Sequence, residues 1–118
     1  MGYRSDVVLI IHKEKITEWM QHLCQHESSR ELVLSYRDYS DANFNGEGHL
    51  LYRWTSIKWY DTFDEIQEIT AFIDGLEDGD HYRFVRTGEE GDDYEERGYL
   101  AQNQVYPVVT NYINIDGI

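Results

Sequence analysis

Six carboxylates crowd one short segment of the chain, residues 89–96, where only Gly91 and Tyr94 interrupt them. They are Glu89, Glu90, Asp92, Asp93, Glu95 and Glu96. Like charges this close repel one another, so each carboxylate needs water or a positive partner. Two interpretations follow: a solvated acidic turn, or a surface that binds a metal ion or a basic patch on another protein.

Two other kinds of carboxylate chemistry fit the pattern less well. Glycosidases place a carboxylate pair in a cleft that desolvates one partner, whereas this run of charge is expected to be exposed. Asp74, Asp78 and Asp80 have part of the spacing of a calcium loop. An EF-hand, however, needs a bidentate Glu at its twelfth position, where counting from Asp74 gives Val85. The EF-hand is therefore excluded, while a weak divalent-cation site within residues 89–96 stays open.

His22 and His26 are four residues apart, a spacing that can place two imidazoles of one helix on one metal ion. Cys24 lies two residues from each and points elsewhere, so we expect polar-face histidines without a metal. As the only cysteine, Cys24 excludes an intrachain disulfide, and on an apolar stripe it is expected to be a small core residue. Phosphate-binding loops and nucleophile elbows are absent from the sequence, and we expect no catalytic residues and no cofactor.

The elements that position these residues follow from hydrophobic periodicity. Residues 6–12 form a continuous apolar run, which is typical of a central strand covered on both faces. Residues 13–26 place apolar side chains at helical spacing and predict a helix with one buried stripe. The stripe consists of Ile16, Trp19, Met20, Leu23 and Cys24. Ser28 and Ser29 end this helix, and residues 31–39, rich in Leu, Val and Tyr, predict a strand.

A hairpin is predicted next. Residues 40–48 have turn chemistry, and Asn45-Gly46 within them is the strongest hairpin signal of the chain. The second arm, residues 49–60, is rich in aromatic and β-branched residues. Tyr52, Trp54 and Tyr60 alternate to one side of this arm, and Leu51, Ile57 and Trp59 to the other. Both faces of the sheet are therefore expected to carry aromatic side chains.

A second helix is predicted after the hairpin. Thr62 and Glu65 have the spacing of a capping box, which starts the helix, and Gly75 or Gly79 ends it. Its buried stripe is expected to consist of Phe63, Ile66, Ile69, Phe72, Ile73 and Leu76.

The predicted fold class is α+β. A strand over residues 80–87 leads into the acidic segment, and residues 94–101 predict a return strand. The tail carries Val105, Val108, Val109, Tyr112, Ile113 and Ile115. Pro107 restricts any strand there to a sheet edge. The order β-α-β-β-α-β predicts a ferredoxin-like antiparallel sheet with two helices on one face and one or two extra C-terminal strands, in a single domain of residues 1–118. The second face would be open, or covered by the tail.

Overall charge limits the partners. The 118 residues carry 23 Asp and Glu against 10 Lys and Arg, a formal net charge of −13. Nucleic acid and anionic lipid are polyanions, so we expect no direct binding to nucleic acid or membranes. No apolar run has the length of a membrane span, and the first residues lack the apolar core of a signal peptide. We therefore expect a cytoplasmic protein.

Three short motifs carry a resemblance. They are Met1-Gly2-Tyr3-Arg4-Ser5-Asp6-Val7, Ile57-Lys58-Trp59-Tyr60, and Phe84-Val85-Arg86-Thr87-Gly88-Glu89-Glu90 leading to Asp92-Asp93. Together they resemble a group of small acidic hypothetical proteins of tailed bacteriophages, which has no assigned activity or site. The resemblance implies a phage accessory protein that acts in the cytoplasm of the bacterial host. Small acidic phage proteins often inhibit defence systems such as CRISPR, some by imitating the phosphates of DNA.

The leading hypothesis is an inhibitor that occupies a basic surface of a host or defence protein and is not an enzyme. Its partner-binding residues would be Asp74, Glu77, Asp78, Asp80, Glu89, Glu90, Asp92, Asp93, Tyr94, Glu95 and Glu96. A second hypothesis is a small-ligand or nucleotide-binding domain, or an enzyme, that uses Tyr52, Arg53, Trp54 and Arg83 on the free sheet face or in a homodimer cleft. A third is a structural phage component.

Overall fold

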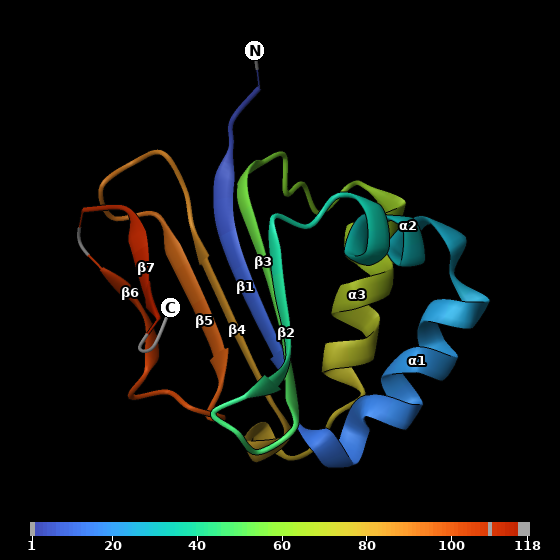
Figure 1. Cartoon of the computed structure of the whole chain (residues 1–118). Helices are drawn as coiled ribbons and strands as arrows, with labels where there is room; N and C mark the ends of the chain where they lie inside the picture. Colours follow the sequence, from blue (N-terminus) through green and yellow to red (C-terminus); the bar gives the residue numbers. More distant parts are fainter. Residues whose placement is uncertain (1, 109, 116–118) are drawn as a thin grey trace.

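The computed structural model describes residues 2–108 and 110–115. In chain order its elements are β1 Ser5–Ile11, a 3₁₀ turn Lys13–Lys15, α1 Ile16–Gln25, α2 Glu27–Ser35, β2 Tyr39–Phe44, β3 His49–Ile57, α3 Asp64–Asp74, a 3₁₀ turn Gly79–His81, β4 Tyr82–Thr87, β5 Tyr94–Gly98, β6 Val105–Val108 and β7 Tyr112–Ile115. A five-stranded antiparallel sheet has the order β2-β3-β1-β4-β5, and β6 and β7 form a second sheet. The three helices cover one face of the large sheet, and β6-β7 lies against the other (Figure 1).

β1 is the central strand, as its apolar run predicts. Val7, Leu9 and Ile11 belong to the core beneath the helices, whereas Val8 and Ile10 belong to the core beneath β6-β7. All five side chains are fully buried. Because both faces of β1 are covered, its residues are apolar in succession and do not alternate with polar ones.

The strand predicted over residues 31–39 is wrong, because most of that segment is helix α2. Ser29, Leu32 and Val33 are buried at helical spacing, while Leu34 and Tyr36 are exposed. The Ser29 hydroxyl donates to the Glu65 carbonyl at 3.0 Å and lies 2.7 Å from a carboxylate oxygen of Glu68, which fixes α2 against α3. The helical layer therefore has three helices where two were expected.

The predicted stripe of α1 is half right. Trp19 and Leu23 are buried and Ile16 packs against them, but Met20 is 42% exposed and Cys24 is also exposed. Met20 and Cys24 follow Trp19 and Leu23 by one residue each, which turns them about 100° away from the sheet. The helix meets its neighbours through one narrow face, so the predictions of core positions for Met20 and Cys24 are wrong.

The hairpin turn is confirmed, with Asn45 at φ 62° and Gly46 at φ 70°, the left-handed pair that Asn-Gly favours. Further along β3, Ser56 has φ 55°, and the pairing with β1 shifts register at this point. A bulge of this kind adds one residue to the strand, so the strand residue after it faces the side opposite to the one that strict alternation gives. Trp59 lies just past the end of β3. Ile57 and Trp59 join Tyr52 and Trp54 in the core beneath the helices, and the expected division of these aromatic residues between two faces is wrong.

α3 follows its predicted stripe but not its predicted start. Ile66, Ile69 and Ile73 are buried, and Phe63, Phe72 and Leu76 pack against them. Phe63 is the N-cap residue and no side chain caps the helix, so the capping box of Thr62 and Glu65 is wrong. The helix starts later than predicted, and Thr62 precedes the cap position. Gly75 ends the helix as predicted.

The C-terminal hairpin covers the second face of the large sheet, which the sequence left either open or covered by the tail. Val105, Ile113 and Ile115 pack against Val8, Ile10, Leu51 and Val85 of the large sheet. Pro107 lies in β6, which pairs with β7 within the described residues. Val109, which the tail prediction included, lies outside the described residues.

Candidate acidic binding site

The structure divides the predicted site between two ends of the sheet. Glu77, Asp78 and Asp80 lie around the 3₁₀ turn before β4, and Asp74 ends α3. Glu89, Glu90, Asp92 and Asp93 lie in the turn between β4 and β5, at the opposite end (Figure 1). At about 3.3 Å per residue, β4 alone separates the two groups by roughly 17 Å. The predicted carboxylates therefore lie in two groups at the ends of β4, with Glu95 and Glu96 along the neighbouring strand β5.

Arg86 of β4 clamps the acidic turn from behind. Its Nη2 lies 2.7 Å from Oδ1 of Asp93, its Nε lies 2.7 Å from Oε1 of Glu95, and its Nη1 donates to the hydroxyl of Ser5 at 3.0 Å. The Tyr3 hydroxyl also donates to Asp93. The hydrogen bond from Arg86, followed by that from Tyr3, holds the pKa of Asp93 below its usual value. Asp93 is thus an anchor of the turn.

Arg83 is the buried counterpart of this clamp, with 3% of its surface exposed. Its guanidinium lies 2.8 Å from Oε1 of Glu96 and donates to the carbonyls of Gly98 at 2.9 Å and Val105 at 3.1 Å. Every interaction of this group fixes β5 or β6 to β4. Arg83 and Glu96 are therefore structural.

A third arginine, Arg97, forms an ion pair with Asp74 at the end of α3. Together, the three arginines form ion pairs with four of the predicted partner-binding carboxylates. They are Asp74, Asp93, Glu95 and Glu96. An ion-paired carboxylate presents less negative potential to a partner than a free one.

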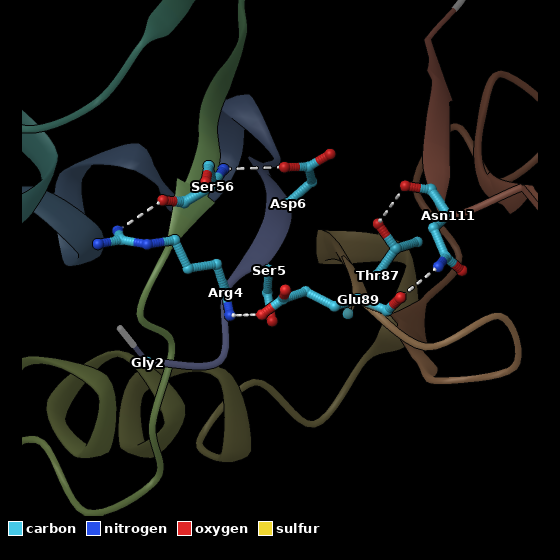
Figure 2. Close-up of a pocket in the computed structure, with 9 residues that line it drawn as sticks. Gly2, Arg4, Ser5, Asp6, Ser56, Thr87, Glu89 and Asn111 are labelled. Atoms are coloured by element: carbon cyan, nitrogen blue, oxygen red, sulfur yellow. Dashed lines mark hydrogen bonds between the residues drawn. The ribbon is translucent and has the colours of Figure 1, made fainter.

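Glu89 is anchored differently, at the rim of a polar pocket of about 580 Å³. Its Oε2 accepts from the backbone N–H of Arg4 at 2.6 Å, and its carbonyl accepts from Nδ2 of Asn111 at 2.9 Å. In Figure 2, Arg4 and Asn111 contact Glu89 from its two sides, and Asp6 and Thr87 also line the pocket. The N-terminal segment and the β6-β7 turn thus hold the first half of the acidic turn.

Four predicted carboxylates have neither an ion pair nor a side-chain hydrogen bond within residues 2–108 and 110–115. They are Glu77, Asp80, Glu90 and Asp92, all exposed. Asp78 accepts from the backbone N–H of Asp80 at 2.9 Å. Glu90 and Asp92 flank Gly91 at the tip of the turn, and open space surrounds the position of a Cβ on Gly91. Tyr94, at the start of β5, is also exposed. Among the predicted residues, these are both exposed and free of ion pairs within the described part of the chain.

The histidines fall into two groups. The rings of His22 and His26 stack at 4.1 Å between centroids, and both are engaged with carbonyls: Nε2 of His22 with Glu68 O at 2.8 Å, and Nδ1 of His26 with His22 O at 2.7 Å. No group of three metal-ligating side chains with the geometry of a metal site occurs in the described part of the chain. A second group, His12, His49 and His81, was missed from the sequence. His12 follows β1, His49 begins β3 and His81 precedes β4. The strand order β3-β1-β4 brings them together at one end of the sheet and is the signal that would have revealed them.

The small-ligand site expected on the sheet does not form from its four residues. Tyr52 and Trp54 are buried beneath the helices. Arg53 is the neighbour of both in β3 and points to the opposite face, and Arg83 is buried under β6. The aromatic and cationic groups therefore lie on different sides of the sheet.

None of the helices within the described residues is long and apolar enough to cross a membrane. Comparisons of the chain with protein-family models, with curated proteins and with solved structures gave no significant match.

Proposed function

We propose that the protein is a non-catalytic inhibitor whose acidic β4-β5 hairpin binds a basic surface of another protein. The partner in this proposal is a nucleic-acid-binding host or defence protein, and the resemblance to phage proteins supplies the setting, a bacterial cytoplasm during infection. The observation that carries the proposal is the tip of the hairpin, where Glu90 and Asp92 are exposed and unpaired within the described residues while the residues around them are anchored.

The anchoring matters because binding is weakened when a loop must be ordered. Tyr3, Arg4 and Arg86 fix the turn from one side and Asn111 from the other, so little further ordering is needed. Residues 74–97 contain ten carboxylates and three arginines, a formal net charge of −7 with His81 neutral. Such a field steers a cationic partner and makes association fast and sensitive to salt.

Because several of the partner-binding residues predicted from the sequence are ion-paired within the chain, the proposed contact surface is smaller than the predicted one. Asp93, Glu95 and Glu96 support the hairpin, and Glu90, Asp92 and Tyr94 would make the contacts. A DNA-mimicking variant of the proposal adds Glu77 and Asp80 at the far end of the sheet, so that a long basic groove would meet both ends.

We also infer that the large sheet is ferredoxin-like. The order β2-β3-β1-β4 with antiparallel pairing throughout supports this, as does the alternation of strands and helices along the chain. In that view β5, α2 and the β6-β7 hairpin are additions to the core arrangement.

The test compares two double variants in capture experiments from bacterial lysate at low and high salt. Glu90→Gln with Asp92→Asn removes two charges from the tip, and Glu27→Gln with Asp61→Asn removes two exposed charges elsewhere. The proposal expects a basic protein that is captured at low salt and lost at high salt, retained by the control variant and lost by the tip variant. Equal capture by both variants would contradict the proposal.

The polar pocket supports a second candidate function, binding of a small ligand. Asp6 and Glu89 each use one carboxylate oxygen internally and line this pocket together with Arg4, whose guanidinium donates to the carbonyl of Ser56. Two carboxylates against one cation disfavour a phosphate-bearing ligand and favour a cationic one. A thermal-shift comparison of arginine, spermidine and ATP tests this function. A shift with spermidine that Asp6→Asn abolishes would support it, and the absence of any shift would count against it.

A further inference from the structure

Two histidine rings accept hydrogen bonds from consecutive backbone amides where β1 passes into α1. The N–H of Lys13 donates to Nδ1 of His49 at 3.0 Å, and the N–H of Glu14 donates to Nδ1 of His12 at 3.1 Å. A ring nitrogen that accepts a hydrogen bond must carry no proton, so both rings are neutral with the proton on Nε2. The position of Glu47 agrees, because its Oε2 lies 2.9 Å from Nε2 of His49.

Burial and the neighbouring rings disfavour additional positive charge on His12. His49 is 2% exposed, and the ring of His12 lies 4.5 Å from that of His49 and 5.5 Å from that of His81, between centroids. Burial is the main cause that lowers the pKa of His12, followed by the neighbouring His49, while Glu14 opposes both. The other charged groups facing this cluster are Lys13, Glu47 on His49, and Glu14 at 4.0 Å from His81.

We infer that this cluster is an acid-sensitive latch: protonation of His12 and His49 at Nδ1 breaks both hydrogen bonds and releases the connection between β1 and α1. The latch goes beyond the proposed binding function and does not depend on it. Two backbone bonds remain in the connection, from His12 N to His81 O at 2.9 Å and from Lys15 N to His12 O at 2.8 Å. The opening is therefore local.

The other two histidines provide a contrast within the same molecule. Nδ1 of His26 lies 2.7 Å from the carbonyl of His22, and Nε2 of His22 lies 2.8 Å from the carbonyl of Glu68. A carbonyl only accepts, so these ring nitrogens are donors and remain donors when the ring is protonated. Acid breaks the bonds of His12 and His49 but not those of His22 and His26.

The first test needs no variant. Imidazole ¹⁵N chemical shifts at pH 7.5 should show the Nε2–H form for His12 and His49 and the Nδ1–H form for His26. Amide hydrogen exchange, corrected for the intrinsic pH dependence, should show protection of Lys13 and Glu14 falling by about fivefold or more as the pH is lowered from 7.5 to well below the ordinary histidine pKa of about 6.5, as expected for one lost hydrogen bond each. The Leu9 amide in the centre of β1 should keep its protection. An Nδ1–H form of His12 or His49, or unchanged protection of Lys13 and Glu14, would overturn the inference.

The second test replaces the titrating acceptor by one that does not titrate. Asn is a good residue at an N-cap position, and its Oδ1 can accept from the Glu14 amide at any pH. His12→Asn should therefore abolish the acid-induced loss of protection at Glu14. His26→Asn, the matched control at the N-cap of α2, should leave that loss unchanged. The same acid response in His12→Asn as in the native chain would refute the latch, and the tautomer measurement stands even where a variant folds poorly.

Discussion

Replacement of Arg86 by Met tests whether the ion pairs of Arg86 stabilise the fold more than an ordinary surface ion pair does. The side chain of Arg86 is 12% exposed, and its guanidinium bonds Asp93 and Glu95, whose side chains are 31% and 53% exposed. Removing one partner of a fully buried ion pair lowers the free energy of unfolding by about 3–5 kcal/mol, but water can solvate Asp93 and Glu95 once Arg86 is removed. We therefore expect Arg86→Met to lower the free energy of unfolding by about 2–3 kcal/mol.

The matched control is Arg97→Met, because Arg97 has the same kind of partner in a more exposed setting. Its side chain and that of Asp74 are 36% and 59% exposed. An exposed pair contributes about 0–1 kcal/mol. Urea unfolding followed by circular dichroism measures both variants. At an m-value of about 1.5 kcal/mol/M, Arg86→Met should move the midpoint by roughly 1–2 M and Arg97→Met by less than about 0.7 M. Equal losses for the two variants would refute the reasoning.

The pH dependence adds an independent check on the same network. Arg86, and after it Tyr3, hold the pKa of Asp93 below the value of about 3.9 expected in the unfolded chain. The unfolded state therefore takes up a proton before the folded state does as the pH falls. The stability that Asp93 contributes is present above about pH 4 and is lost as the pH falls through the lower folded value. The difference between the native chain and Arg86→Met should accordingly shrink below about pH 4, and a constant difference down to pH 2 would contradict the assignment.

Two further predictions concern positions where the structure sets a sharp local constraint. Gly98 has φ 82°, and a Cβ there would lie 2.1 Å from the carbonyl oxygen of Tyr82. Gly98→Ala should therefore lower the free energy of unfolding in urea by at least about 2 kcal/mol, whereas Gly91→Ala, in open space, should change it by less than about 0.5 kcal/mol. Similar effects of the two substitutions would count against the turn geometry. Cys24 is exposed on α1, so a chromogenic thiol reagent should modify it in the native protein without denaturant, and a reaction that requires urea would show that the thiol is covered.

Much of the fold could be predicted from local pattern because the patterns were long or chemically specific. The apolar run of β1, the Asn45-Gly46 turn and the isoleucine stripe of α3 each have one good structural solution. Helix α2 was missed because Leu32, Val33 and Leu34 together favour a strand, whereas burial selects only the first two of them. The exposure of Leu34 is a tertiary outcome, and no local propensity contains it.

For the candidate site, the sequence indicated that Arg83, Arg86 and Arg97 could pair with the acidic run, but not which arginine holds which carboxylate. Register, not sequence proximity, gives each carboxylate its partner: the β4-β5 pairing places Arg86 opposite Glu95 and Val85 opposite Glu96. Opposite charges across an antiparallel pair stabilise the hairpin, so a correct register would have predicted the clamp. The contribution of Tyr3 to Asp93 is different, since it joins residues 90 positions apart and depends on the whole sheet.

The same register argument explains why the acidic run is not uniform in role. Charge that is needed to fix a strand cannot also be free to meet a partner, because an arginine that neutralises Asp93 or Glu95 also lowers the negative potential these groups present. Only at the turn, where pairing between β4 and β5 ends, do Glu90 and Asp92 lie beyond the reach of the chain's own cations in the described residues. The paired carboxylates therefore give the hairpin its shape, and the unpaired ones give it a charged tip. A hairpin built in this way keeps its geometry in the absence of a partner, since Asp93, Glu95 and Glu96 at its base are already paired with arginine.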